Sequence, residues 1–124
     1  MLLLDTHVLL WWLDDPASLE APARRLIADP RNRVFVSAAV AWEITIKRQL
    51  GKLEAPDDLE AALEQERFQH LPITVGHALA VAELPAIHGD PFDRIQIAQA
   101  RLDALTIVTR DATIPRYDVP CLRA

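Results

Sequence analysis

Four short apolar runs along the chain have the length of β-strands. Three are continuous rather than alternating, and they cover Leu2 to Leu4, Val34 to Val36 and Leu105 to Val108. Continuous apolar runs are typical of strands that are buried on both faces of a parallel sheet. A fourth, weaker run covers Leu71 to Val75, and it fits either a strand or a loop that leads into a helix.

Between these runs, apolar residues recur at the spacing of amphipathic helices. The pattern predicts helices over Thr6 to Leu13, Ser18 to Ala28, Ser37 to Leu50, Asp57 to Glu66, Val75 to Leu84 and Pro91 to Leu102. Ser37 is a favourable N-cap, and Gly51 follows the end of the same helix. Strands and helices therefore alternate, which predicts an α/β fold with a parallel sheet and right-handed crossovers.

Length and charge narrow the class of protein. The 124 residues fit one domain, which we expect to cover 1–124. A net charge of −5 argues against a general basic nucleic-acid binder, but it leaves room for an enzyme whose positive charges are local or supplied by metal ions. The single cysteine, Cys121, cannot form an internal disulfide, so nothing indicates an oxidising compartment.

The apolar N-terminal segment fits neither a signal peptide nor a membrane span. It has no positively charged start, and Asp5 and His7 interrupt it before the polar residues Asp14 and Asp15. Both features argue against export or insertion. We therefore expect a cytoplasmic protein without a membrane anchor.

Four acidic residues lie at the edges of apolar elements: Asp5, Glu43, Asp93 and Asp111. Asp5 and Asp111 come at or just past the carboxyl ends of predicted strands, where open α/β sheets bind ligands. If the fold brings all four together, the like charges raise each other's pKa values and repel. A divalent cation would neutralise such a cluster, so the pattern indicates a metal site.

Each acid also has a purely structural interpretation. Asp5 can cap the helix that follows it, and Asp111 can cap a short turn. Glu43 can pair with Lys47 one helical turn later, a contact worth a few tenths of a kcal/mol. Asp90 can be an N-cap, with Asp93 as the acid of the first helical turn. Capping and metal binding do not exclude each other at these positions.

Four segments resemble the PIN-domain ribonucleases, and among them the VapC-type toxins of bacterial toxin–antitoxin pairs. They are Leu3 to His7, Val36 to Ile44, His88 to Ala100 and Ile107 to Asp111. The resemblance implies a three-layer PIN-like α/β fold, with a central, mostly parallel sheet of four to five short strands flanked by helices.

The same resemblance implies a metal-dependent endoribonuclease that hydrolyses RNA phosphodiester bonds. Asp5, Glu43, Asp93 and Asp111 would form its acidic site, with Mg²⁺, or alternatively Mn²⁺, as the cofactor. We assign Asp5 and Asp93 as direct metal ligands. Asp111 and Glu43 would bind a second ion, hold waters or orient the nucleophile, and the number of ions stays open. Whether Asp90 joins the site or only caps its helix is also open.

Several further residues are candidates for substrate contacts. Thr109 matches a small hydroxyl residue that the family keeps near the last acid. Arg94 and Arg110 neighbour site acids, and a local basic group is formed by Lys47, Arg48 and Lys52. Each of these cations can equally be a solvated surface charge. His7 and His88 could serve as acid–base groups, but the family chemistry does not require them.

Expected partners are the RNA substrate, a second copy of the chain in a homodimer, and a VapB-like antitoxin whose tail lies in an apolar groove. The apolar regions 8–13 and 50–63 are candidates for that groove. Alternatives are a PIN nuclease in RNA processing without a toxin role, and a non-catalytic interaction domain. A receiver-type phosphoacceptor fits poorly, because Asp5 stands alone and no lysine follows Lys52. The sequence does not specify the RNA target.

Overall fold

A five-stranded parallel sheet forms the centre of the protein in a computed structural model that describes residues 1–124. The strands are β1 Leu2–Leu4, β2 Val34–Ser37, β3 Gln69–Leu71, β4 Thr106–Thr109 and β5 Cys121–Arg123. Their order across the sheet is β3-β2-β1-β4-β5, and every neighbouring pair is parallel. The predicted α/β class with a parallel sheet is confirmed.

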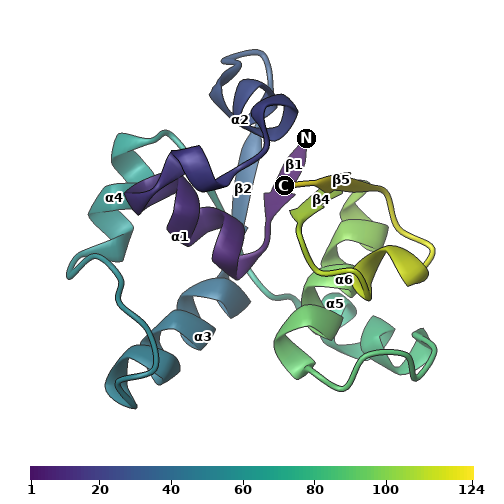
Figure 1. Ribbon diagram of the computed structural model, residues 1–124. Coiled ribbons are helices and arrows are strands. Elements are labelled where there is room, and N and C mark those ends of the chain that lie inside the picture. The colour runs from purple at the N-terminus through teal and green to yellow at the C-terminus, as the bar shows by residue number, and fades with distance from the viewer.

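Helices cover both faces of this sheet, so the fold has three layers (Figure 1). The α-helices are α1 Thr6–Asp14, α2 Ala21–Ala28, α3 Ala38–Gln49, α4 Leu59–Gln65, α5 Val75–Ala80 and α6 Pro91–Asp103. Short 3-10 turns cover Pro16–Ser18, Val81–Glu83 and Ile114–Arg116. In Figure 1, α1 to α4 lie on one side of the sheet, and α5 and α6 lie on the other. None of these helices has the length and apolar character needed to cross a membrane.

The two faces of the sheet explain why the predicted strands are continuously apolar. Leu2 and Leu4 face one core, which α1, α2, α3 and α4 cover, whereas Leu3 faces a second core with Ile97 of α6 and Ile107 of β4. Because side chains alternate along a strand, a strand buried on both sides needs apolar residues at every position.

Three elements differ from those predicted. Strand β3 covers Gln69–Leu71, so of the two interpretations of the run from Leu71 to Val75 the loop that leads into a helix is the correct one, and α5 begins at Val75. This strand lies at the edge of the sheet, where pairing with β2 rather than apolar character determines its extent. The helix predicted from Ser18 begins at Ala21, because Leu19 and Glu20 have extended backbone. Strand β5 was not predicted from its three-residue sequence.

Candidate metal centre

The carboxyl edge of the sheet carries a row of polar residues. Asp5 follows β1, Ser37 ends β2, and Thr109 ends β4. Strand β1 lies between β2 and β4, so the chain leaves it toward one side and later returns on the other. Ligands of open α/β sheets bind in the crevice at such a switch point.

Asp5 is buried at this point, with 8% of its surface exposed. Its Oδ1 accepts a hydrogen bond from the backbone N–H of Thr6 at 2.7 Å, and its Oδ2 accepts one from the Thr109 hydroxyl at 2.7 Å. Burial raises the pKa of Asp5 above its usual value, although these hydrogen bonds act in the opposite direction. Asp5 therefore caps α1 and also presents a carboxylate to the crevice.

Glu43 reaches the same place from α3 and is 4% exposed. Its Oε1 accepts a hydrogen bond from the Thr6 hydroxyl at 2.6 Å, and its Oε2 accepts one from Lys47 Nζ at 2.6 Å. Thr6 thus connects two acids, because its backbone N–H binds Asp5 and its hydroxyl binds Glu43. The pairing of Glu43 with Lys47 that the sequence suggested is present, but the pair is half-buried at the site instead of lying on an exposed stripe.

Asp93 enters the site from the first turn of α6. Asp90 caps this helix and accepts hydrogen bonds from the backbone N–H groups of Phe92 and Asp93. Burial raises the pKa of Asp93 to about 7, and the nearby charges of Asp5, Asp90 and Glu43 add to this shift, whereas His88 opposes it. In the metal-free site, Asp93 is the acid on which the mutual repulsion of the cluster is concentrated.

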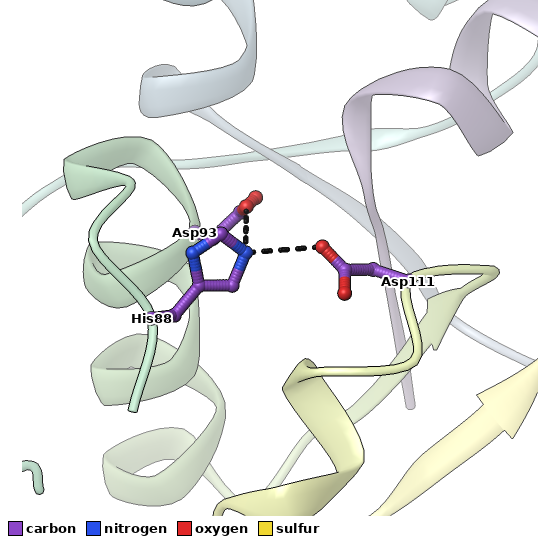
Figure 2. Close-up of side chains that lie close together, drawn as sticks. All are labelled: His88, Asp93 and Asp111. Carbon is purple, nitrogen blue, oxygen red and sulfur yellow. Dashed lines mark hydrogen bonds and ion pairs between the residues drawn. The ribbon is translucent and has the colours of Figure 1, made fainter. Parts of the chain in front are cut away.

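His88 lies between two of the acids, as Figure 2 shows. Its Nε2 is 2.9 Å from Asp93 Oδ2 and 3.0 Å from Asp111 Oδ2. The backbone N–H of Asp90 donates to His88 Nδ1 at 3.1 Å, so Nδ1 is an acceptor and Nε2 carries the proton. Burial alone would lower the pKa of His88, but the hydrogen bond to Asp111 and the charges of Asp93, Asp111 and Asp90 outweigh it and raise the pKa.

Asp111 is held by the loop that follows β4. Its Oδ1 accepts a hydrogen bond from the backbone N–H of Thr113 at 2.7 Å, and its own N–H donates to the Thr109 hydroxyl at 3.0 Å. Burial opposes ionisation of Asp111, but the hydrogen bonds from Thr113 and His88 prevail, and its pKa is lowered. The predicted turn cap at Asp111 is therefore present, and the other carboxylate oxygen remains directed at His88.

One pocket of about 360 Å³ brings these acids together. Its lining includes the four predicted acids Asp5, Glu43, Asp93 and Asp111, together with Asp90, His88, Lys47 and Arg110. Only Trp11 contributes a hydrophobic side chain to the wall. Residues that are up to 106 positions apart in the chain (from 5 to 111) thus share one polar cavity.

The predicted substrate residues have different positions. Arg94 does not line the pocket; its guanidinium donates to the carbonyls of Pro85, Val81 and Leu84. The substrate contact expected for Arg94 stays a prediction, and in the structure its donors hold the segment that precedes α6. Thr109 links Asp5 to the Asp111 backbone.

Arg110 lies in the wall of the pocket, with its guanidinium 4.3 Å from the centre of the Trp11 ring. Its Nη2 donates to the carbonyls of Ser18 and Ala124. The side chain is therefore held by the protein rather than extended toward solvent.

Sequence reasoning gave too little weight to Thr6, Lys47 and His88. His88 precedes the Asp90 cap by two residues, and the turn between them aims its ring at Asp93 and Asp111. The signal available in the sequence was the compact order His88, Asp90, Asp93 within one helix entrance. His7 is exposed and lines the same pocket.

The residues present fit a hard divalent cation. Carboxylate oxygens are the ligands that Mg²⁺ and Mn²⁺ prefer. The pKa of Asp93 is raised first by burial and then by the neighbouring carboxylates, whose negative charge a cation would offset. One oxygen each of Asp93 and Asp111 lies, with His88 Nε2, in a group whose atoms are within 4.8 Å of one another. Because Nε2 carries a proton in this arrangement, the oxygens rather than the ring would supply the ligands. The fold and these donors define a parallel α/β protein with a carboxylate site suited to a divalent metal.

The PIN domain family matches residues 2–120, and the chain therefore belongs to this family. Ribonuclease VapC22 of Mycobacterium tuberculosis is 28% identical over 122 residues, which cover 95% of this chain and 92% of that protein. Ribonuclease VapC16 of the same organism is 40% identical over 58 residues, which cover 44% of this chain but only 40% of that protein.

A solved structure shares the fold along almost the whole chain. It is the crystal structure of VapBC2 from Rickettsia felis bound to a DNA fragment from their promoter. The TM-score is 0.74 at 14% sequence identity, with 98% of this chain and 97% of that chain covered. The three-layer architecture predicted from the family resemblance is confirmed.

Proposed function

We propose that this PIN-domain protein is a metal-dependent endoribonuclease and the toxin of a toxin–antitoxin pair. The observation that carries the proposal is the convergence of Asp5, Glu43, Asp93 and Asp111 in one polar pocket at the switch point of the sheet. The similarity to two ribonucleases of the VapC type supports RNA as the substrate. The expected reaction is hydrolysis of a phosphodiester bond.

We propose Mg²⁺ as the cofactor, held by Asp5, Asp93 and Asp111. When bound, the ion would offset the negative charge of the scissile phosphate and increase the acidity of the attacking water. Thr109 and Thr6 hold the Asp5 carboxylate in one orientation through hydrogen bonds of 2.7 Å each. The pocket walls fix the remaining acids, so little reorganisation accompanies substrate binding.

The antitoxin partner is proposed to be VapB-like and to bind beside α1. A hollow of about 360 Å³ lies between α1 and the segment 54–56, and its apolar lining includes Leu10, Trp11 and Leu13. Trp11 also lines the acidic pocket, so a chain lying in the hollow would lead to the acids. These positions fall within the two apolar regions predicted from the sequence. An RNA substrate of this kind implies action in the cytoplasm.

We also propose a homodimer. Trp42 of α3 and Val75 and Leu79 of α5 are 61%, 76% and 70% exposed, which is unusual for large apolar side chains. Light scattering of the purified protein tests this expectation, and a mass of about 14 kDa, which is that of one chain, would contradict it.

The decisive experiment compares the wild type with Asp5→Asn. Both proteins are expressed in bacteria, growth is followed, and the 5′ ends of cellular RNA are sequenced. We expect growth arrest and new 5′ ends with the wild type and neither with Asp5→Asn. The matched control is Asp14→Asn, which changes an exposed aspartate at the end of α1 outside the acidic pocket and should behave as the wild type.

Identical 5′ ends from the wild type and Asp5→Asn would refute the nuclease proposal. New 5′ ends without growth arrest would support a nuclease in RNA processing instead of a toxin. Co-expression of the reading frame adjacent to the gene should relieve the arrest if that frame encodes the antitoxin.

A further inference from the structure

We propose that Lys47 is a substrate-binding residue whose ammonium group occupies the second cationic position of the acidic pocket and donates to an oxygen of the RNA phosphate. This inference rests on the proposed nuclease function and deepens it. It also assigns Glu43 the task of holding Lys47, so that the site uses one metal ion and one lysine.

The position of Lys47 allows it to contact a substrate at the acids. Lys47 lies in the last turn of α3 and lines the same pocket as Asp5, Asp93 and Asp111. Its side chain is 35% exposed, so the ammonium group can be reached from solvent while part of the stem is covered. A phosphate that approaches the acids through the open side of the pocket would meet this group.

The ammonium group of Lys47 does not use all of its hydrogen-bond donors within the protein. A lysine has three N–H donors, and Nζ of Lys47 makes one hydrogen bond in the structure, to Glu43 Oε2 at 2.6 Å. Two donors are therefore available to an incoming acceptor. Arg110, the arginine of the pocket wall, instead directs its Nη2 at the carbonyls of Ser18 and Ala124.

The contacts of Glu43 argue against a second metal ion at this residue. Oε1 accepts from the Thr6 hydroxyl and Oε2 accepts from Lys47, so both oxygens already have partners within the protein. A second metal ion at Glu43 would have to displace Lys47.

Together these contacts separate the acids into two groups. Asp5, Asp93 and Asp111 face the proposed metal, whereas Glu43 neutralises and orients a lysine. A phosphate bound between the two cations would be contacted from both sides. Lysine is well suited to this task, because its ammonium group acts as a point charge that adapts to the position of an anion.

RNA binding without cleavage tests the proposal. The probe is a fluorescein-labelled single-stranded RNA of 20 nucleotides of mixed sequence, and Ca²⁺ replaces Mg²⁺. Fluorescence anisotropy gives the affinity of the wild type, Lys47→Met and Lys47→Arg over a series of salt concentrations. The matched control is Arg101→Met, which removes an exposed cation in the last turn of α6, outside the pocket.

We expect Lys47→Met to bind about tenfold more weakly than the wild type and to lower the slope of log affinity against log salt by about 0.7, the value for one lost phosphate contact on a single strand. Lys47→Arg should retain the slope, and Arg101→Met should leave affinity nearly unchanged. A titration with Mn²⁺ followed by electron paramagnetic resonance should give one ion per chain in the wild type.

Loss of folding can be separated from loss of binding. Lys47→Met leaves the buried Glu43 without its cation, so the double variant Glu43→Gln/Lys47→Met is measured as well, with circular dichroism to verify the fold. This neutral pair should fold and show the same weakened binding and reduced salt slope.

Equal affinity and salt slope for Lys47→Met and Arg101→Met would overturn the role of Lys47, and two Mn²⁺ ions per wild-type chain would overturn the one-ion site. If wild-type RNA cleavage survives Asp5→Asn, the nuclease proposal itself fails, and the Lys47 proposal fails with it. If RNA cleavage requires Asp5 but RNA affinity is the same in Lys47→Met and the wild type, the Lys47 proposal alone is refuted.

Discussion

At the scale of single residues, the acids of this site have two tasks each. Asp5 and Asp90 cap helices, and Asp111 caps a turn, while their carboxylates line or border one cavity. The two threonines connect these tasks, because Thr6 binds Asp5 and Glu43 while Thr109 binds Asp5 and the Asp111 backbone. Capping by these acids is therefore compatible with the proposed metal site.

Thr109→Val tests the contribution of one such link. The change keeps the shape but removes the hydroxyl that donates to Asp5 and accepts from the Asp111 N–H. We expect Mn²⁺ affinity, measured by calorimetry, to fall about tenfold or more, which is typical when a group that orients a metal ligand is lost. Thr45→Val is the control, since its hydroxyl binds the Ala41 carbonyl on an exposed part of α3. Unchanged affinity in Thr109→Val would show that the hydroxyl does not orient Asp5.

Asp93 makes the stability of the metal-free protein depend on pH. Its pKa is raised from 3.8 to about 7, so between these values the folded protein keeps a proton that the unfolded chain has released. Rising pH therefore favours unfolding in this window, and the loss of stability is complete above the folded pKa. The raised pKa also means that metal binding below neutral pH requires release of this proton.

Chemical denaturation in EDTA at several pH values checks this sign. We expect Asp93→Asn to be more stable than the wild type at pH 8, by roughly 2–4 kcal/mol, and the advantage should vanish toward pH 4. An advantage that is the same at both pH values would indicate that charge on Asp93 is not its cause.

At the scale of elements, the N-terminal ends of α3 and α6 determine where the acidic side chains of the site lie. The Asp90 cap and Pro91 begin α6 so that Asp93 falls in its first turn, and the Ser37 cap begins α3 one and a half turns before Glu43. Ser37 also donates to Gln99 Oε1 of α6 at 2.6 Å, which joins the two helices that carry these acids.

Ser37→Ala should weaken this junction. The change removes the cap of the Ala39 N–H and leaves the buried Gln99 Oε1 without its donor. We expect a loss of about 2–3 kcal/mol in the free energy of unfolding by urea. Asp58→Ala serves for comparison, because it removes an exposed cap from α4 and should cost only about 1 kcal/mol. Equal losses in the two variants would mean that the bond to Gln99 adds nothing to the cap.

The C-terminal end of α6 offers a change in the opposite direction. Ala104 ends the helix with φ 57° and ψ 48°, a left-handed conformation that is unfavourable for residues with a Cβ atom. Ala104→Gly should therefore raise the free energy of unfolding by about 0.5–1 kcal/mol. The site lies at the other end of α6, so RNA cleavage should stay at the wild-type level; a lower stability would show that the Ala104 methyl group contributes packing.

At the scale of the whole molecule, the acidic pocket joins distant parts of the chain, so metal binding is coupled to global stability. An ion that binds only the folded state stabilises it by about 2.7 kcal/mol at one hundred times its Kd, which for a chain of this length raises Tm by roughly 10 °C. Differential scanning fluorimetry with Mg²⁺ or EDTA measures this shift. Asp5→Asn/Asp93→Asn should abolish it, and a shift that persists in this variant would place the ion elsewhere.

Much of the fold and of the site could be predicted from the sequence, for identifiable reasons. The strands at Leu2, Val34 and Leu105 were found because burial on both faces requires unbroken apolar runs. Strands β3 and β5 were missed or shifted, because at the sheet edges pairing with a neighbour replaces apolar character as the cause of the strand. The backbone contacts of Arg94 could not be predicted for a similar reason, since its partners lie outside the pattern of its own helix.

The sequence by itself indicated the order of the elements apart from the edge strands, several capping residues and the four acids. These depend on local periodicity, on residue chemistry and on motifs that resemble a known family. Only the tertiary structure decided which groups face one another across the switch point of the sheet. The insertion of His88 between Asp93 and Asp111, the link through Thr6 and the aim of Lys47 belong to this second class. They depend on strand order and helix packing, which are set by contacts between residues far apart in the chain and so leave no local pattern to detect.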